Sequence, residues 1–165
     1  MTKITQVEIH EFGFDIPNLG NLTGADSVGA IGYMKGAVSR IEKFALVIIT
    51  EDGCRGEYVT HWCSTPSTCA QAKTLAPKLI GRHAEEREGI YDDMKRELRQ
   101  FDRMGQGPID IALWDWAGKH LDCSVSVLLG GYRKKLPAYA STYHGDRKGG
   151  LDCKEAFADF AEHCF

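Results

Sequence analysis

Alternating apolar and polar positions at the start of the chain predict three β-strands. They are expected over residues 3–16, 38–50 and 54–60, which are rich in β-branched and aromatic types. The run from Phe44 to Ile49 is apolar on both faces, which is typical of a strand covered on both sides. Asp52-Gly53 favours a tight turn between the last two strands, because glycine accepts positive φ. Residues 17–36 are dense in glycine and predict a mobile loop.

Three helices are expected next, over residues 65–81, 85–101 and 108–121, because apolar residues recur there at helical spacing. Thr65-Pro66 favours the start of the first helix, and Gly81 its end. The predicted apolar stripes are Cys69, Ala72, Ala76, Leu79 and Ile80; then Ile90, Met94, Leu98 and Phe101; then Ile109, Ala112, Leu113, Trp116, Ala117 and Leu121. The opposite side of the second helix is densely charged, which we interpret as a solvated face and not as a binding patch.

The third helix is apolar on more than one side, because Ile111 and Trp114 point away from its main stripe. A helix of this kind is normally buried. We therefore predict that it forms a seam between two packed bodies. The pattern then changes: a helical turn over residues 124–129 ends at Gly130-Gly131, a short strand is expected over residues 136–143, and an amphipathic helix over residues 152–165.

Composition and charge argue against several classes of function. The net charge is -3 and no basic run is present, whereas nucleic-acid binding needs clustered Lys and Arg. The longest apolar run, residues 44–49, is far too short to cross a membrane, and the N-terminus lacks a signal-peptide core. The sequence thus predicts a cytoplasmic protein whose six cysteines are free thiols. His61, Cys63 and Cys69 fit no common zinc spacing.

Three segments carry a resemblance to a known family. They are IDIALWDWAGK over residues 109–119, LLGG over residues 128–131 and PAYAS over residues 137–141. Together with the hairpin sequence LVIITEDG over residues 46–53, they resemble the mandelate racemase and muconate lactonizing branch of the enolase superfamily. The similarity covers essentially the whole chain in order, and the segment 109–141 is its most specific part. Residues 123–126 depart from the family, which often has a proline there.

The resemblance implies an α+β capping domain, a three-stranded antiparallel meander followed by a helical bundle, over residues 1–135. Residues 136–165 would then be the first strand-helix unit of an incomplete TIM-type (β/α) barrel, which needs about 250 residues when complete. The chemistry implied is abstraction of the proton α to a carboxylate, with Mg²⁺ stabilising the enediolate.

In the family, the base lysine lies on the second barrel strand and three carboxylate metal ligands lie on the third to fifth. None of those segments is in this sequence, so we expect no catalytic residue and no metal ligand in the chain, and no activity from the chain alone. Asp110, Asp115 and Glu57 belong to the capping region, and we expect them to have structural roles.

The resemblance also implies that the capping domain closes the barrel mouth with two loops that select the substrate. The first loop matches the glycine-rich segment, the second matches residues 57–64, and a third group follows the first barrel strand. The alternatives are incidental loop side chains, local packing of the tryptophan, and a histidine paired with a nearby aspartate. The candidate substrate-binding residues are Tyr33, Met34, Lys35, His61, Trp62, Tyr143, His144 and Asp146.

Two functions remain open from the sequence. The first is the specificity-determining end of a Mg²⁺-dependent lyase or isomerase that acts on a small hydroxy acid or sugar acid and assembles as a homo-oligomer. Within that class the resemblance favours a dehydratase over a racemase or cycloisomerase. The second is a non-catalytic, self-associating α+β interaction module.

Overall fold

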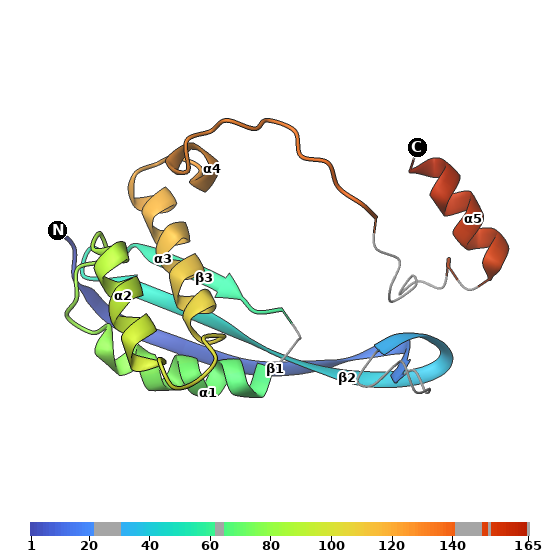
Figure 1. Cartoon of the computed structure of the whole chain (residues 1–165), viewed down its shortest axis with the longest axis horizontal. Coiled ribbons are helices and arrows are strands. Elements are labelled where there is room, and N and C mark those ends of the chain that lie inside the picture. The colour runs from blue at the N-terminus through green and yellow to red at the C-terminus, as the bar shows by residue number, and fades with distance from the viewer. Residues whose placement is uncertain (22–30, 62–64, 141–149, 152, 165) are drawn as a thin grey trace. The chain divides into compact units, whose positions relative to one another are not determined.

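In the computed structural model, the chain begins with a three-stranded sheet whose order is β1-β2-β3 (Figure 1). The structure describes residues 1–21, 31–61, 65–140, 150–151 and 153–164. β1 spans Ile4–Asn21, β2 spans Ile31–Thr50 and β3 spans Arg55–Val59. The three-stranded antiparallel sheet predicted from the sequence is confirmed.

β2 and β3 form the tight hairpin that the Asp-Gly pair predicted. The strands run antiparallel with Ile49 opposite Arg55 next to the turn. Gly53 has a φ of +82°, and its N–H donates to the Thr50 carbonyl at 2.8 Å. A side chain at position 53 would be strained in this conformation, which explains why glycine follows Asp52 there.

The three long helices predicted from the sequence are present; the first two are shorter than predicted, and the third begins two residues earlier and ends one residue earlier. In the described residues the helical elements are α1 (Thr65–Leu75), the 3₁₀ turn η1 (Ala76–Lys78), α2 (Arg87–Glu97), α3 (Gln106–His120), α4 (Val125–Leu128) and α5 (Lys154–His163). In α1, α2 and α3, the residues predicted for the apolar stripe are mostly buried. Ile80, Phe101 and Leu121 were predicted for the stripes but are 49%, 67% and 58% exposed. Each of them lies beyond the last residue of its helix, where helical periodicity no longer sets direction.

The chain divides into two compact units, of which the first contains residues 1–12 and 42–134. Its helices α1, α2 and α3 gather on one side of the sheet (Figure 1). Phe44, Leu46 and Ile48 alternate along β2 and are fully buried beneath them. The sequence predicted that both faces of this strand are covered. On the second face Val47 is buried but Ile49 is only half-buried, so the cover there is partial. One well-packed core therefore holds the hairpin and the helices together.

The close approach of α3 to β3 depends on a glycine in the strand. A Cβ placed on Gly56 would lie 2.0 Å from the Ala112 carbonyl oxygen and 2.6 Å from the Trp116 Cβ. No side chain fits in that space, so the helix backbone can rest directly on the strand. Ala112, Leu113 and Trp116 are buried as a result, and the main stripe predicted for this helix is confirmed.

The second unit contains residues 13–41 and 135–165. The prediction of a mobile loop over residues 17–36 is wrong for the described residues, because 17–21 belong to β1 and 31–36 to β2. Glycine here permits close packing: a Cβ on Gly20 would lie 2.9 Å from the Met34 Sδ. The Gly36 N–H donates to the Asn18 Oδ1 at 3.0 Å, which links the two arms.

The strand predicted over residues 136–143 is not seen in its described part. Residues 136–140 form no strand, because no neighbouring strand pairs with them in the described chain. The start of a barrel at residue 136 therefore stays a prediction, as does the division of the chain at that position. None of the helices in the described residues is long and apolar enough to cross a membrane.

Candidate functional site

Polar residues of the 109–119 segment attach α3 to the edge of the sheet. Asp115 accepts a hydrogen bond from the backbone N–H of Glu57 at 2.8 Å, which satisfies an edge group of β3. The Lys119 Nζ lies 2.7 Å from the Asp115 Oδ2 and 3.1 Å from the Glu57 Oε2. Partial burial lowers the pKa of Lys119, but these two carboxylates outweigh it and the net shift is upward. The structural roles expected for Asp115 and Glu57 are confirmed.

Trp116 connects the same helix to the hairpin turn. Its indole N–H donates to the Thr50 Oγ1 at 2.9 Å, and the Thr50 hydroxyl donates to the Asp52 Oδ1 at 2.6 Å. His120 stacks on the indole at 4.6 Å and its Nδ1 lies 3.2 Å from the Asp52 Oδ2. The hydroxyl of Thr50, followed by the N–H of Cys54, lowers the pKa of Asp52. These contacts hold the C-terminal half of α3 against the hairpin turn.

His61 lies at a small pocket at the end of β3. The pocket has a volume of about 240 Å³ and lies between β3, α1 and the start of α3. Its lining residues are Tyr58, Thr60, His61, Thr68, Met104, Gly107, Pro108 and Ile111. The Thr60 hydroxyl is already engaged, since it donates to the Phe44 carbonyl at 3.1 Å. The pocket therefore offers an apolar wall with an exposed histidine beside it, and no cluster of catalytic groups.

Tyr33, Met34 and Lys35 lie on β2 in the second unit. The Tyr33 ring packs edge-on against Phe157 of α5, with 6.2 Å between the ring centroids. Its hydroxyl is buried and has no hydrogen-bond partner among the described residues. Met34 is 39% exposed, and Lys35 is exposed. The strand thus presents an unsatisfied phenol, a thioether and an ammonium group in consecutive positions.

The other predicted site residues, Trp62, Tyr143, His144 and Asp146, lie outside the described residues. Within the part of the chain that the structure describes, no group of three or more His, Cys, Asp or Glu side chains could hold a metal ion. The described residues therefore do not fit a magnesium site. The five described cysteines, among them buried Cys69, are free thiols, and burial is the main cause that raises the pKa of Cys69.

The sequence did not predict a partly buried pair of charged residues, Arg87 of α2 and Asp110 of α3. The Arg87 guanidinium lies 4.3 Å from the centroid of the Trp114 ring, and its Nε is buried without a hydrogen-bond partner in the described chain. Burial, followed by the nearby Glu88 carboxylate, raises the pKa of Asp110 against the opposing effect of Arg87. Helical spacing alone places Asp110 outside the main apolar stripe of α3. Its partial burial results from the packing of α2 on α3, which the local sequence does not show.

Replacing Asp110 by asparagine is expected to stabilise the chain at neutral pH. A carboxyl with a raised pKa in the fold keeps its proton longer than in the unfolded chain. The wild type therefore loses stability as pH rises from about 3.9, the usual Asp pKa, through the raised value. Below that window the two proteins should be equally stable. Urea unfolding at several pH values measures the difference, with exposed Asp92→Asn on α2 as the control; a constant difference at all pH values would contradict the assignment.

Comparison with known proteins decides which family this arrangement represents. The profile of the mandelate racemase / muconate lactonizing enzyme N-terminal domain matches residues 33–130, from near the start of β2 to just beyond the end of α4. The chain belongs to this family. The match includes β3 and α3, so the resemblance stated from the sequence is confirmed, and the match covers residues 109–130 of its most specific segment.

Curated relatives of this family member are sugar-acid enzymes. Arabinonate dehydratase from Saccharolobus solfataricus is 32% identical over 116 residues, which is 66% of this chain and 31% of the relative. D-galactarolactone cycloisomerase from Agrobacterium fabrum is 41% identical over 113 residues, which is 64% of this chain and 30% of the relative. The chain thus spans about a third of the length of the curated relatives that it matches.

Solved structures of family members share the fold. D-glucarate dehydratase from Agrobacterium tumefaciens, in complex with magnesium, has a TM-score of 0.68 and 30% identity, and the match covers 98% of this chain and 41% of that chain. L-talarate dehydratase from Polaromonas sp. JS666, in complex with magnesium and L-glucarate, has a TM-score of 0.69 and 22% identity, over 99% of this chain and 44% of that chain. The second comparison shows the fold alone.

Proposed function

We propose that this chain is the capping region of a Mg²⁺-dependent enzyme that removes the proton α to the carboxylate of a sugar acid. Membership of the family, carried by the match over residues 33–130, is the observation that supports this most strongly. The names of the curated relatives narrow the substrate class, since they act on arabinonate, galactarolactone and anhydrogalactonate. Dehydration is the favoured outcome, with cycloisomerisation as the alternative within the same chemistry.

The proposed reaction explains why the described residues contain no catalytic cluster. A carbon next to a carboxylate is a very weak acid, so its deprotonation needs a positioned base and a divalent cation that stabilises the second negative charge. By the family resemblance, those groups belong to the second to fifth strands of a barrel, whereas this chain holds the capping region and the segment expected to begin the barrel. Its contribution is then to bind and enclose the substrate.

Three neighbouring side chains on β2 have the chemistry for substrate selection. The buried Tyr33 hydroxyl lacks an acceptor within the described residues, and a substrate oxygen would supply one. The exposed Lys35 ammonium complements a carboxylate, and Met34 offers an adaptable apolar surface. His61 and the apolar pocket beside it are the second candidate contact. Trp62, Tyr143, His144 and Asp146 remain candidates by their positions in the sequence.

The test uses the intact natural gene product with Mg²⁺ and a panel of aldonic and aldaric acids. Loss of the α proton and of the neighbouring hydroxyl gives an enol that becomes a 2-keto-3-deoxy acid, which is measured by its carbonyl. We expect turnover of at least one acid and none after chelation of the metal. A Tyr33→Phe variant should raise KM by about three- to tenfold with a smaller change in kcat, since it removes one hydrogen bond.

A natural product that folds, self-associates and turns over no acid in the panel would contradict the proposal and favour a non-catalytic module. An unchanged KM in the Tyr33→Phe variant would remove Tyr33 from the substrate contacts while leaving the reaction class in place. Val38→Ala is the matched control, because Val38 lies on the same strand, is 66% exposed and is not among the candidate substrate contacts.

A further inference from the structure

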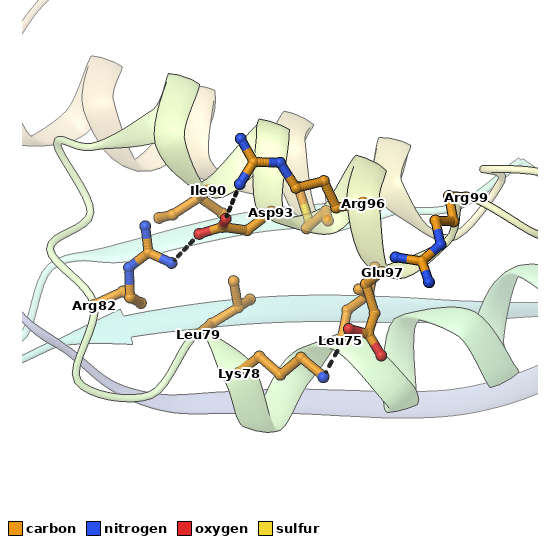
Figure 2. Close-up of a pocket in the computed structure, with 10 residues that line it drawn as sticks. Leu75, Lys78, Leu79, Arg82, Ile90, Asp93, Arg96, Glu97 and Arg99 are labelled. Atoms are coloured by element: carbon orange, nitrogen blue, oxygen red, sulfur yellow. Dashed lines mark hydrogen bonds and ion pairs between the residues drawn. The ribbon is translucent and has the colours of Figure 1, made fainter.

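A pocket in the first unit lies between α2 and the segment that connects it to α1 (Figure 2). It has a volume of about 350 Å³, within the range of about 300–1,000 Å³ that is usual for small-molecule sites. Its floor belongs to the hydrophobic core and consists of Leu75, Leu79, Ile90 and Met94, each at most 3% exposed. The pocket is therefore part of the packed fold and is not formed by loose surface side chains.

Cationic side chains dominate the rim of this pocket. Four of the lining residues carry a positive charge and two carry a negative charge, in a chain whose net charge is -3. The cationic residues are Lys78, Arg82, Arg96 and Arg99, and the anionic residues are Asp93 and Glu97. An anion is the ligand that this excess of positive charge favours.

Three of the four cationic side chains at the rim, those of Lys78, Arg82 and Arg96, form ion pairs with nearby carboxylates. Asp93 lies 2.7 Å from the Arg82 Nη1 and 3.9 Å from the Arg96 Nη1, and Arg82 also lies 3.9 Å from Glu86. The Lys78 Nζ lies 2.9 Å from the Glu97 Oε2.

Arg99 differs from the other three cations, because among the described residues no carboxylate lies within ion-pair distance of its guanidinium. Figure 2 shows it beside Glu97 at the end of the pocket. Arg99 therefore has a full set of donors for a ligand.

We propose that this pocket binds a small organic anion that has a carboxylate or phosphate group on an apolar body. The oxyanion group would be bound by Arg99 with support from Lys78, and the apolar body would cover Leu79 and Met94. A sugar acid fits poorly, because its hydroxyl groups would lose water against the hydrocarbon floor without gaining partners. The pocket is thus distinct in its chemistry from the site proposed for the substrate.

The methionine methyl groups provide a direct test in the 165-residue chain. The chain has four methionines, of which only Met94 lines this pocket. With ¹³C-methyl methionine, titration with benzoate or phenyl phosphate should shift the Met94 signal to saturation and leave Met34 and Met104 unchanged. Whichever of the two probes binds more tightly identifies the oxyanion that the pocket prefers. D-gluconate, a sugar acid of similar charge to benzoate, should leave Met94 unchanged.

Arg99→Gln should weaken binding of the better probe by about tenfold, since it removes a charge-assisted hydrogen bond. Arg103→Gln is the matched control, because Arg103 is also exposed, lies four positions away and does not line the pocket. The proposal is overturned if neither probe saturates the Met94 signal, if gluconate shifts it equally, or if Arg99→Gln and Arg103→Gln bind as the wild type does. The proposal does not rest on catalysis, so it can fail while the proposed function stands.

Discussion

Replacing Gly56 by alanine is expected to lower the free energy of unfolding of the first unit by about 3 kcal/mol or more. The added Cβ would lie 2.0 Å from the Ala112 carbonyl oxygen, a backbone atom that no side-chain rotation can move. Helix α3 must therefore shift away from β3. That shift weakens the packing of Trp116 and lengthens the hydrogen bond between the Glu57 N–H and the Asp115 carboxylate.

Urea unfolding followed by far-UV circular dichroism measures this effect, and Gly107→Ala is the matched control. Gly107 lies in α3 and a Cβ there would have no atom within 4 Å. Alanine should change the free energy of unfolding there by less than about 1 kcal/mol, because its gain in helix propensity is opposed by the restriction that Pro108 places on the preceding residue. Equal effects of the two substitutions would show that α3 does not rest on β3 as described.

The second large effect is expected at Trp116, which is 1% exposed and is among the largest buried side chains. Trp116→Ala should cost about 3–5 kcal/mol, because it leaves a cavity in the core and removes the donor to Thr50. Trp116→Phe fills most of the space but loses the hydrogen bond, and should cost about 1–2 kcal/mol. The phenylalanine variant keeps the prediction measurable if the alanine variant fails to fold.

Trp114→Ala is the matched control for this prediction. Trp114 is the same residue type, two positions away on the same helix, but it is only half-buried beneath Arg87. Thermal or urea unfolding should show less than half the loss seen for Trp116→Ala. A larger loss at Trp114 than at Trp116 would mean that the helix presents its other side to the core.

The hydrophobic pattern predicted the core of α3 well, because Ile109, Ala112 and Trp116 recur at helical spacing over a long helix. The ends of the helices were less predictable. Beyond the last residue of a helix the chain changes direction. Phe101 and Leu121 follow the ends of α2 and α3, so the helical spacing no longer predicts which way their side chains point. The local pattern contains no information about where that turn points.

Glycine misled the prediction for the described residues 17–21 and 31–36, since the same residue type occurs in mobile loops and in closely packed strands. A Cβ on Gly20 would lie 2.9 Å from the Met34 Sδ, and this cross-strand contact is not visible in the local sequence. The candidate site shows the same limit. Asp115 and Glu57 are 58 residues apart, and the pairing of Arg82 with Asp93 across the rim of the pocket depends on how α2 packs. The charged side of α2 was interpreted only as a solvated face for this reason.

Family membership and the packing of the first unit together give a consistent account of the chain. The segment that carries the family resemblance contains Asp115, Trp116 and Lys119, whose contacts join α3 to the hairpin. They hold α3 against β3 and the hairpin turn within the first unit. Chemistry is then expected from groups that the described residues do not contain.

Exchange of the α proton in D₂O tests the central claim most directly. The 165-residue chain and the intact natural gene product are each incubated with Mg²⁺ and an aldonic or aldaric acid, and the α position of recovered substrate and product is read by proton NMR. The account predicts deuterium incorporation with the intact product and none with the 165-residue chain. Incorporation by the 165-residue chain that depends on Mg²⁺ would contradict it, because the base and metal site would then lie within these residues.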